Sequence, residues 1–358
     1  MTLDPTIWQN TPVFVTGHTG FKGSWLSLWL HQLGANIYGY ALAPPTQPNL
    51  FEVAEVNRFL SQDTRADLAS LATLRQAMMN AQPHVVFHLA AQPLVRESYR
   101  NPLGTFATNV MGTAHVLDIV RDLPCVKVVI IITTDKVYEN HEWVYPYREV
   151  DRLGGYDPYS ASKAAAELVV SSYRRSFFSG QEQPKLVTVR AGNVVGGGDW
   201  AVDRLVPDCL RAFEVNQPVL LRHPQAVRPW QHVLEPLSGY LQLAEKLLTS
   251  GVYNGAWNFG PGSRGEAQVG EVAAMMAVLW GENAQINAEI MTNQPHEASL
   301  LRLDITRARC ELGWSPRWSI QQALAATIEW HRAWLAGQEM ATYSLGQINA
   351  YQNSVGEL

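Results

Sequence analysis

A short apolar strand, a glycine-rich turn and a helix follow one another near the start of the chain, and this order constrains the fold more than any other feature. Val13-Phe14-Val15-Thr16 predicts a buried strand, and residues 24–30 predict the helix. The turn Gly17-His18-Thr19-Gly20-Phe21-Lys22-Gly23 lets the backbone bend tightly and approach a ligand closely. Because the first N–H groups of a helix attract anions, we expect this turn to hold a dinucleotide pyrophosphate. The spacing is G-x-x-G-x-x-G, not G-x-G-x-x-G, so a structural turn without a ligand is the alternative.

Strand and helix patterns alternate through the first half of the chain. Further apolar strands are expected at residues 36–40, 59–63, 84–89, 128–132 and 185–190, with helices at about 68–80 and 103–121. Because right-handed crossovers wind such units into one sheet, the pattern predicts an α/β fold with a Rossmann-type, doubly wound parallel sheet.

The alternation loosens after residue 190, which divides the chain into two expected domains. We assign residues 1–190 to a dinucleotide-binding Rossmann domain that also carries the reactive residues. Residues 191–358 are expected to form a smaller, mainly helical substrate-binding lobe, with helices near 234–250, 269–280 and 320–336. The boundary is approximate, and segments of the two domains can interleave.

Composition excludes several classes of protein. A net charge of -5 gives no basic surface for nucleic acid, and no apolar run approaches the roughly 20 residues of a membrane span. Cys125, Cys209 and Cys310 lack the spacing of metal ligands, so we expect no metal. Met1 to Asn10 lacks the pattern of a signal peptide, and we expect a cytoplasmic location.

Residues 133 to 163 supply an acid, a possible base and a Tyr-x-x-x-Lys pair. The strand at 128–132 ends in Thr133-Thr134-Asp135-Lys136, and reactive groups at the carboxyl end of a strand suit an α/β sheet. Tyr159 and Lys163 lie four residues apart at the start of a predicted helix, so they share a face. A nearby ammonium lowers the pKa of a phenol below its usual ~10, which would prepare Tyr159 as a general base. The alternative is an ordinary helix start with a surface lysine.

The ends of the next strands do not decide which dinucleotide binds. The second strand ends in Tyr40-Ala41-Leu42, with neither an acid for a ribose hydroxyl nor an arginine for a 2′-phosphate. NAD and NADP therefore stay undecided at this position, and we expect modest affinity. Asp63 is expected to accept a hydrogen bond from an adenine amino group, or to serve as a turn or N-cap aspartate. We interpret His88 as a core histidine and not a ligand.

Four motifs, in sequence order, give the chain a resemblance to the extended short-chain dehydrogenase/reductase superfamily over nearly its whole length. They are Thr16-Gly17-x-x-Gly20-Phe21-x-Gly23, His88-Leu89-Ala90-Ala91, Tyr159-x-x-x-Lys163 and Arg190-x-x-Asn193. Within this superfamily, Thr134-Asp135-Lys136 resembles the catalytic segment of the nucleotide-sugar 4,6-dehydratases. The glycine turn and residues 190–200 and 228–235 are similar to the branch of that family that acts on CDP-glucose.

The resemblance implies NAD as cofactor, CDP-glucose as substrate and loss of water across C5 and C6 of the sugar. Tyr159, assisted by Lys163, would take the proton of the 4-hydroxyl, which Thr134 orients. Asp135 would protonate the departing 6-hydroxyl, and the hydride taken from C4 would return to C6. The implied catalytic residues are Thr134, Asp135, Lys136, Tyr159 and Lys163. The implied cofactor-binding residues are Gly17, His18, Thr19, Gly20, Phe21, Lys22, Gly23, Asp63, Leu89, Ala90, Ala91, Asn109, Tyr159 and Lys163. The implied substrate-binding residues are Gln92, Asn193, Arg204, Arg228 and His296.

Lys136 stands where many 4,6-dehydratases of other nucleotides carry a glutamate that acts as the C5 base. A lysine is a base only when neutral, so its pKa, ~10.4 in water, would have to fall through burial or a nearby cation. The alternative is that Lys136 stabilises the enolate while another group moves the proton.

Other functions stay open from the sequence. They are a nucleotide-sugar 4-epimerase, a 4,6-dehydratase for dTDP-glucose or GDP-mannose, and a dinucleotide-sensing regulator without turnover. An epimerase needs no acid and base at the 5,6 edge, so Asp135 and Lys136 argue against it. The resemblance also implies a homodimer or homotetramer paired through helices at residues 103–121 and 159–178. It implies a role in deoxysugar synthesis, for example for a lipopolysaccharide O-antigen.

Overall fold

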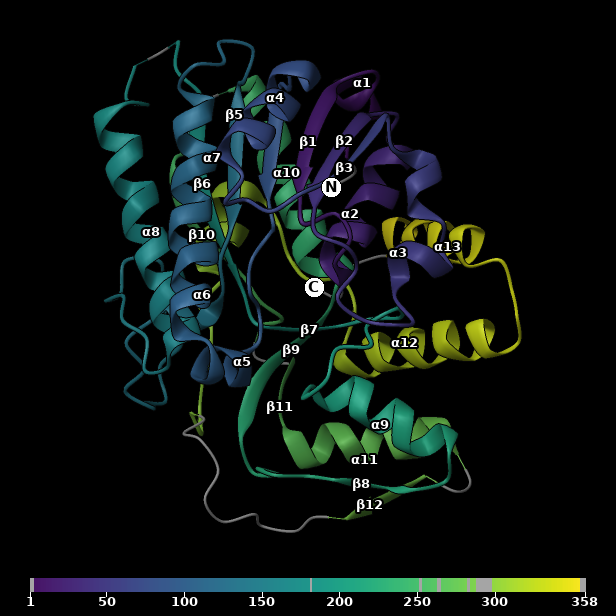
Figure 1. The fold of residues 1–358 in the computed structure, drawn as a ribbon. Coiled ribbons are helices and arrows are strands. Elements are labelled where there is room, and N and C mark those ends of the chain that lie inside the picture. The colour runs from purple at the N-terminus through teal and green to yellow at the C-terminus, as the bar shows by residue number, and fades with distance from the viewer. Residues whose placement is uncertain are drawn as a thin grey trace.

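One sheet of seven parallel strands organises the molecule (Figure 1). The computed structural model describes residues 3–180, 182–250, 253–262, 265–281, 284–287 and 298–354. The order of the strands across the sheet is β10-β6-β5-β4-β1-β2-β3, which confirms the predicted doubly wound, Rossmann-type α/β fold. The strands are β1 (Pro12–Thr16), β2 (Asn36–Ala41), β3 (Gln62–Arg65), β4 (Val85–His88), β5 (Val128–Ile132), β6 (Lys185–Ala191) and β10 (Gly255–Phe259).

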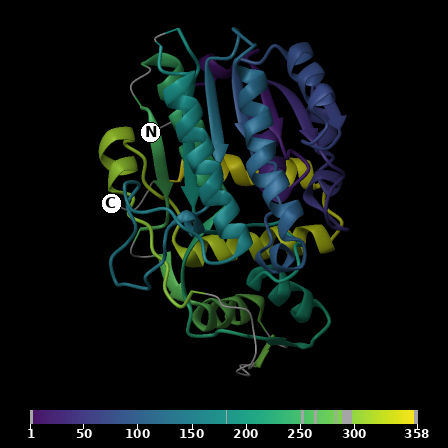
Figure 2. The ribbon, with the colours of Figure 1, turned by 60° about the vertical axis from the view of Figure 1, so that its left-hand side comes forward.

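Helices cover both faces of this sheet, which explains its nearly continuous apolar strands. Val13 and Val15 of β1 belong to the core on one face, whereas Phe14 belongs to the core on the other. The first face packs against α2 (Phe21–Gln32), α10 (Leu234–Thr249), α12 (Ile320–Leu335) and α13 (Met340–Asn353). The second face packs against α4 (Leu71–Ala81), α7 (Gly112–Val120) and α8 (Pro158–Ser176), and Figure 2 shows the last two in front of the strands.

A smaller lobe lies beyond the carboxyl ends of the large sheet's strands, at the bottom of Figure 1. Its core gathers apolar side chains such as Leu210, Trp230 and Met276. The lobe contains β7 (Asn193–Val195), α9 (Leu205–Glu214), β8 (Pro218–Leu220), β9 (Val227–His232), β11 (Glu266–Gln268), α11 (Val269–Trp280) and β12 (Gln285–Asn287). After the first lobe strands the chain returns to the large sheet, where β10 pairs with β6. The two parts therefore interleave along the sequence.

Two elements differ from the expected ranges. The third strand begins at Gln62 because residues 56–59 form a 3-10 turn, so the expected start at residue 59 is wrong. The helix expected at 103–121 is built from α6 (Pro102–Phe106), a π turn (Ala107–Met111) and α7. The remaining short helices are α1 (Pro5–Trp8), α3 (Leu50–Val53), η1 (Val56–Phe59), α5 (Val95–Arg100), η3 (Asp135–Val137) and η5 (Ala308–Leu312). In the described part of the chain, no helix combines the length and apolarity needed to cross a membrane.

Candidate active site

The glycine turn after β1 forms a close-packed cradle at the start of α2. Gly17 has a φ of 76°, and a Cβ there would lie 2.7 Å from the backbone nitrogen of Ala90. A Cβ at Gly23 would lie 2.1 Å from the carbonyl oxygen of Gly17. Gly20 is the N-cap of α2 and has no side chain to bond the first N–H groups of the helix. Because these N–H groups attract anions and no Cβ fills the space, the cradle fits the pyrophosphate of a dinucleotide.

His18 and Asp63 hold each other next to this turn. The buried His18 ring donates from Nε2 to Asp63 Oδ1 over 2.8 Å, and Arg65 donates from Nε to the same oxygen over 2.7 Å. Burial raises the pKa of Asp63, but the hydrogen bonds from His18 and Arg65 outweigh it and lower the pKa to about 2. The described residues that line the cavity include neither His18 nor Asp63. Contact of Asp63 with adenine therefore stays a prediction, and its carboxylate already has two protein partners.

A cavity of about 700 Å³ opens between the carboxyl ends of the strands and the lobe. This is the place where α/β sheets of this type bind ligands. The structure brings together on its wall most of the residues that the sequence singled out. These are Gly17, Thr19, Gly20, Phe21, Lys22, Gly23, Leu89, Ala90, Ala91, Thr134, Asp135, Lys136, Tyr159, Lys163, Asn193, Arg204 and Arg228.

Asp135 is a buried acid at the end of β5. Thr134 donates from Oγ1 to Asp135 Oδ1 over 2.9 Å, and it also caps the 3-10 turn that follows. Asp135 Oδ2 is buried and has no hydrogen-bond partner among the described residues. Burial raises the pKa of Asp135, although the charge of Lys136 and the bond from Thr134 oppose the change. A carboxyl group in this state can stay protonated and give its proton to a leaving group.

Tyr159 lies in the first turn of α8 because this helix start is well defined. Asp157 is the N-cap and accepts from Ser160 N over 2.9 Å, while Pro158 occupies the first helical position. Both features fix where the helix begins. They place Tyr159 beside Thr134, whose hydroxyl group acts to lower the pKa of the phenol.

The expected lowering of the pKa of Tyr159 is wrong in this structure. Burial raises the pKa of Tyr159 to about 12, and the charge of Asp135 adds to the rise, while the hydroxyl group of Thr134 opposes it. Lys163 donates from Nζ to the carbonyl oxygen of Ile132 over 3.1 Å. Burial lowers the pKa of Lys163 itself to about 8. The sequence shows the pair but not the depth of its burial, which decides the direction of both shifts.

Cations surround the acid and the tyrosine. Burial and repulsion by Arg204 lower the pKa of Lys22 to about 8, while Asp135 opposes the change. Arg204 donates from Nη1 to Asp199 Oδ2 over 2.9 Å, and the charge of Asp199 raises the pKa of Arg204. Lys136, directly after Asp135, is half-buried on the cavity wall. The site is therefore electropositive, which suits a phosphorylated ligand.

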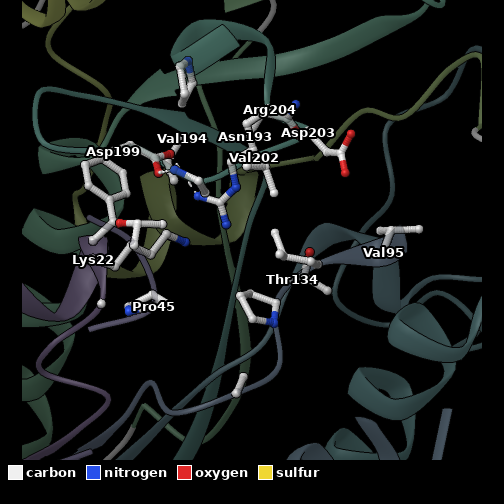
Figure 3. A pocket seen from close by; sticks show the side chains of 18 of the residues that line it. Lys22, Pro45, Val95, Thr134, Asn193, Val194, Asp199, Val202, Asp203 and Arg204 are labelled. Atoms are coloured by element: carbon white, nitrogen blue, oxygen red, sulfur yellow. Dashed lines mark hydrogen bonds and ion pairs between the residues drawn. The ribbon is translucent and has the colours of Figure 1, made fainter. Parts of the chain in front are cut away.

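The lobe supplies the wall opposite the sheet. Asn193 begins β7, and the buried Arg228 of β9 donates from Nη1 to the carbonyl oxygen of Val227 over 2.9 Å. Figure 3 shows Lys22, Thr134, Asn193 and Arg204 around one space, although they come from different segments of the chain.

Two predicted contact residues instead join elements of the scaffold. Asn109 is buried, accepts from Gln92 N over 2.8 Å and donates from Nδ2 to Ser162 Oγ over 2.8 Å. Gln92 donates from Nε2 to Thr105 Oγ1 over 2.9 Å. Neither is among the described residues of the cavity wall, so their ligand contacts remain predictions. His296 lies outside the described residues.

Sequence reasoning missed several residues of the cavity wall. Asp67 and Leu68 follow β3 and line the cavity, and their position after a strand is the only signal for them in the sequence. In the lobe, Asp203 accepts from Arg222 Nη1 over 2.7 Å and lies 3.5 Å from Arg96 Nη1. These three come from separate loops and helices, and no motif in the sequence connects them.

Comparison with known proteins agrees with this geometry. A family model described as GDP-mannose 4,6 dehydratase matches residues 14–327. CDP-glucose 4,6-dehydratase of Salmonella typhimurium is 49% identical, and the match covers 98% of this chain and 99% of that protein.

Solved structures share the fold. The dTDP-glucose 4,6-dehydratase of Bacillus anthracis in complex with NAD has a TM-score of 0.75 at 20% identity, covering 93% of this chain and 99% of that one. MoeE5 in complex with UDP-glucuronic acid and NAD has a TM-score of 0.73 at 26% identity, covering 89% and 98%. The chain therefore belongs to the nucleotide-sugar 4,6-dehydratase family of the extended short-chain dehydrogenases/reductases.

Proposed function

We propose that this chain is a CDP-glucose 4,6-dehydratase that converts CDP-D-glucose to CDP-4-dehydro-6-deoxy-D-glucose and water. The observation that carries the reaction type is Asp135, a buried acid with a raised pKa beside Thr134 and Tyr159. A dehydratase needs an acid for the departing 6-hydroxyl, whereas a 4-epimerase does not. The 49% identity to the Salmonella enzyme over nearly the whole of both chains supports CDP-glucose as the substrate.

The cofactor that we propose is NAD. The backbone of the glycine turn would hold its pyrophosphate, because the turn has open N–H groups and no room for a Cβ. Leu89, Ala90 and Ala91 follow β4 on the cavity wall, where the small side chains of the two alanines leave space for a flat ring. When bound, NAD supplies the acceptor for the hydride of C4 and the donor of the hydride that C6 receives.

Tyr159 and Thr134 would act at the 4-hydroxyl of the glucose. Their side chains are neighbours on the cavity wall, so one substrate hydroxyl group can reach both. Tyr159 accepts the 4-hydroxyl proton as C4 is oxidised. Lys163, one turn further along α8, would stabilise the phenolate against the burial that raises the pKa of Tyr159, and the resulting 4-ketone makes the C5 proton acidic.

Asp135 would complete the elimination. Its protonated carboxyl group gives a proton to the 6-hydroxyl, which leaves as water while the C5 proton is removed. Lys136 is adjacent and either removes that proton or stabilises the enolate. Hydride delivery to C6 and protonation of C5 then give the 6-deoxy-4-ketone, and the overall reaction has no net oxidation.

The nucleotide part of the substrate would lie against the lobe. Arg204 and Arg228 are cations on the cavity wall and suit the diphosphate, since guanidinium groups bind phosphate oxygens through several N–H donors. Asn193 would contact the sugar or the phosphates from the start of β7.

Pairing of two copies through α6, α7 and α8 is proposed as part of this function. Leu103 is 83% exposed, Leu168 is 63% exposed and Met111 is 52% exposed. Leu103 lies on α6 and Met111 on the π turn before α7, and both of these segments contact α8, which carries Leu168. A second copy of the chain would cover them.

Product mass tests the proposed function directly. The purified protein would be incubated with NAD and, in separate reactions, with CDP-glucose, dTDP-glucose, UDP-glucose and GDP-mannose. We expect loss of one water from CDP-glucose without net formation of NADH. Water loss from a different nucleotide sugar would refute the substrate assignment, and an unchanged mass with inverted C4 would make the protein an epimerase.

A further inference from the structure

A buried ion pair lies next to the catalytic groups and has no part in the steps above. Glu167 of α8 and Arg190 of β6 have side chains that are only 4% and 3% exposed. Arg190 donates from Nε to Glu167 Oε1 over 2.8 Å and from Nη2 to Oε2 over 2.9 Å. Neither residue is among the described residues of the cavity wall, so this pair acts from behind the site.

The carboxylate of Glu167 also holds the segment after β5 that carries the acid. Thr133 donates from Oγ1 to Glu167 Oε1 over 2.7 Å, and Thr188 donates from Oγ1 to Oε2 over 2.7 Å. With Arg190, these bonds give each oxygen two donors, which fully satisfies the buried carboxylate. Thr133 directly precedes Thr134, so the bonds connect α8 to the segment that carries the acid.

Helix α8 therefore contacts the last residue of β5 and the residue that follows it. Lys163 reaches the carbonyl oxygen of Ile132, and Glu167, one turn further along, reaches the hydroxyl group of Thr133. A turn of an α-helix rises about 5.4 Å, so a slide or rotation of α8 would break both contacts. Such a movement would also carry Tyr159 away from Thr134.

Tyr138 completes this arrangement on the other side of Arg190. It accepts from Arg190 Nη1 over 2.8 Å and donates to Asn258 Oδ1 over 2.7 Å. Asn258 belongs to β10, so the network joins β10 to β6 and, through Glu167, to α8. Arg190 is thus held in place and cannot follow a displaced Glu167 without losing other bonds.

We propose that Glu167 and Arg190 are positioning residues, whose ion pair fixes Tyr159 and Lys163 on α8 relative to Thr134 and Asp135 after β5. The inference rests on the proposed dehydratase function, because it concerns the same site. A buried ion pair is not needed for stability as such, since apolar residues often serve as well. Its directed bonds instead fix one position of the helix against the strand end.

The charge of Glu167 allows a second, independent test of the positioning role, through the pH dependence of kcat. Burial and Lys22 lower the pKa of Lys163, and Glu167 opposes this effect. The charged groups that influence the pKa of Lys163 are Lys22 from α2 and Glu167 from α8, and the charge of Lys163 in turn lowers the pKa of His88 on β4. Loss of the Glu167 charge should therefore move the basic limb of the kcat profile to lower pH.

Glu167→Gln and Glu235→Gln form a matched test. Both carboxylates are buried, but Glu235 binds Tyr351 and the backbone of residues 317 and 318, away from the cavity wall. For Glu167→Gln we expect kcat on CDP-glucose to fall by a factor on the order of 100, with KM little changed. The deuterium isotope effect of C4-labelled substrate should rise, because C4 oxidation becomes slower. Glu235→Gln should keep wild-type kcat per folded molecule and the wild-type isotope effect.

Variants of Thr133 keep the test decisive if Glu167→Gln folds poorly. Thr133→Val removes the hydroxyl group at nearly constant shape, and Thr133→Ser retains it. We expect the first to raise the isotope effect and the second to restore it. If Glu167→Gln or Thr133→Val loses activity only in proportion to folded protein, with unchanged isotope effect and pH profile, the positioning role is refuted. If the wild-type protein releases no water from CDP-glucose, both proposals are refuted. If the wild type is active but the variants keep its isotope effect and pH profile, only the positioning role is refuted.

Discussion

Thr134 donates a hydrogen bond to Asp135, with 2.9 Å between Oγ1 and Oδ1, and this contact gives the two oxygens of the carboxyl group different roles. Oδ1 is held by the protein. Oδ2 is buried and has no partner in the described part of the chain. A buried polar atom without a partner is costly, so its retention here points to a contact with substrate.

Asp135→Asn should stop elimination but not oxidation at C4. An amide cannot protonate the 6-hydroxyl, and loss of a general acid costs on the order of 10²- to 10⁴-fold in rate. Since Tyr159 and Thr134 remain, reduced cofactor should accumulate on the enzyme and be visible by its absorbance. Asp122→Asn, at an exposed aspartate paired with Arg75, is the control. An Asp135→Asn variant with wild-type turnover would exclude Asp135 as the acid.

The same substitution should stabilise the fold at neutral pH. Because burial raises the folded-state pKa of Asp135, its ionisation above the unfolded value of 3.8 costs stability, and Asn removes that cost. The gain in Tm over wild type should therefore shrink as the pH falls toward 3.8.

Asp63→Asn should instead lower the stability of the fold at neutral pH. The pKa of Asp63 is lowered to about 2, so its charge stabilises the fold above pH 3.8 and this contribution disappears as the pH falls toward about 2. After allowance for screening at this partly exposed group, the loss at neutral pH should be about 1 kcal/mol. Thermal melts of both variants from neutral to acidic pH check the pair of predictions, and equal signs would contradict them.

Gly23→Ala should weaken NAD binding at least tenfold, ~1.4 kcal/mol. The new Cβ would lie 2.1 Å from the carbonyl oxygen of Gly17, so the cradle must deform. Gly346→Ala is the matched control, because a Cβ there meets nothing within 4 Å and the residue lies within α13. That control should keep the affinity and gain roughly 0.5–1 kcal/mol of stability. Titration of NAD into cofactor-free protein measures the affinities, and an unchanged Kd for Gly23→Ala would place the pyrophosphate elsewhere.

Lys136→Met separates the two roles of this lysine. If Lys136 removes the C5 proton, incorporation of solvent deuterium at C5 should fall together with turnover. If it only stabilises the enolate, the exchange should continue at a reduced rate through another base. Mass spectrometry of the product made in deuterium oxide measures the label. Undiminished exchange would exclude Lys136 as the base.

Much of the fold could be predicted because its signals are local. The strand, glycine turn and helix from Pro12 to Gln32 depend on apolar runs and on glycines within one short stretch. The cluster of Thr134, Asp135 and Tyr159 followed from their places at a strand end and a helix start. These features do not require knowledge of distant segments.

The features that the sequence did not predict depend on distant contacts. The raised pKa of Tyr159 arises from burial under lobe and sheet segments, which a four-residue spacing cannot reveal. The bonds of Asp63 to His18 span 45 residues, and the ion pair of Asp203 with Arg222 joins two loops. The third strand begins later than expected because residues 56–59, shortly before it, form a 3-10 turn.

The fate of the C4 hydrogen tests the central claim most directly. CDP-glucose labelled with deuterium at C4 would be converted by the protein with unlabelled NAD, and the product analysed by NMR. We predict that the deuterium appears at C6 of CDP-4-dehydro-6-deoxyglucose within the same molecule. Deuterium that returns to C4, with an unchanged mass and an inverted hydroxyl group, would contradict the dehydratase assignment.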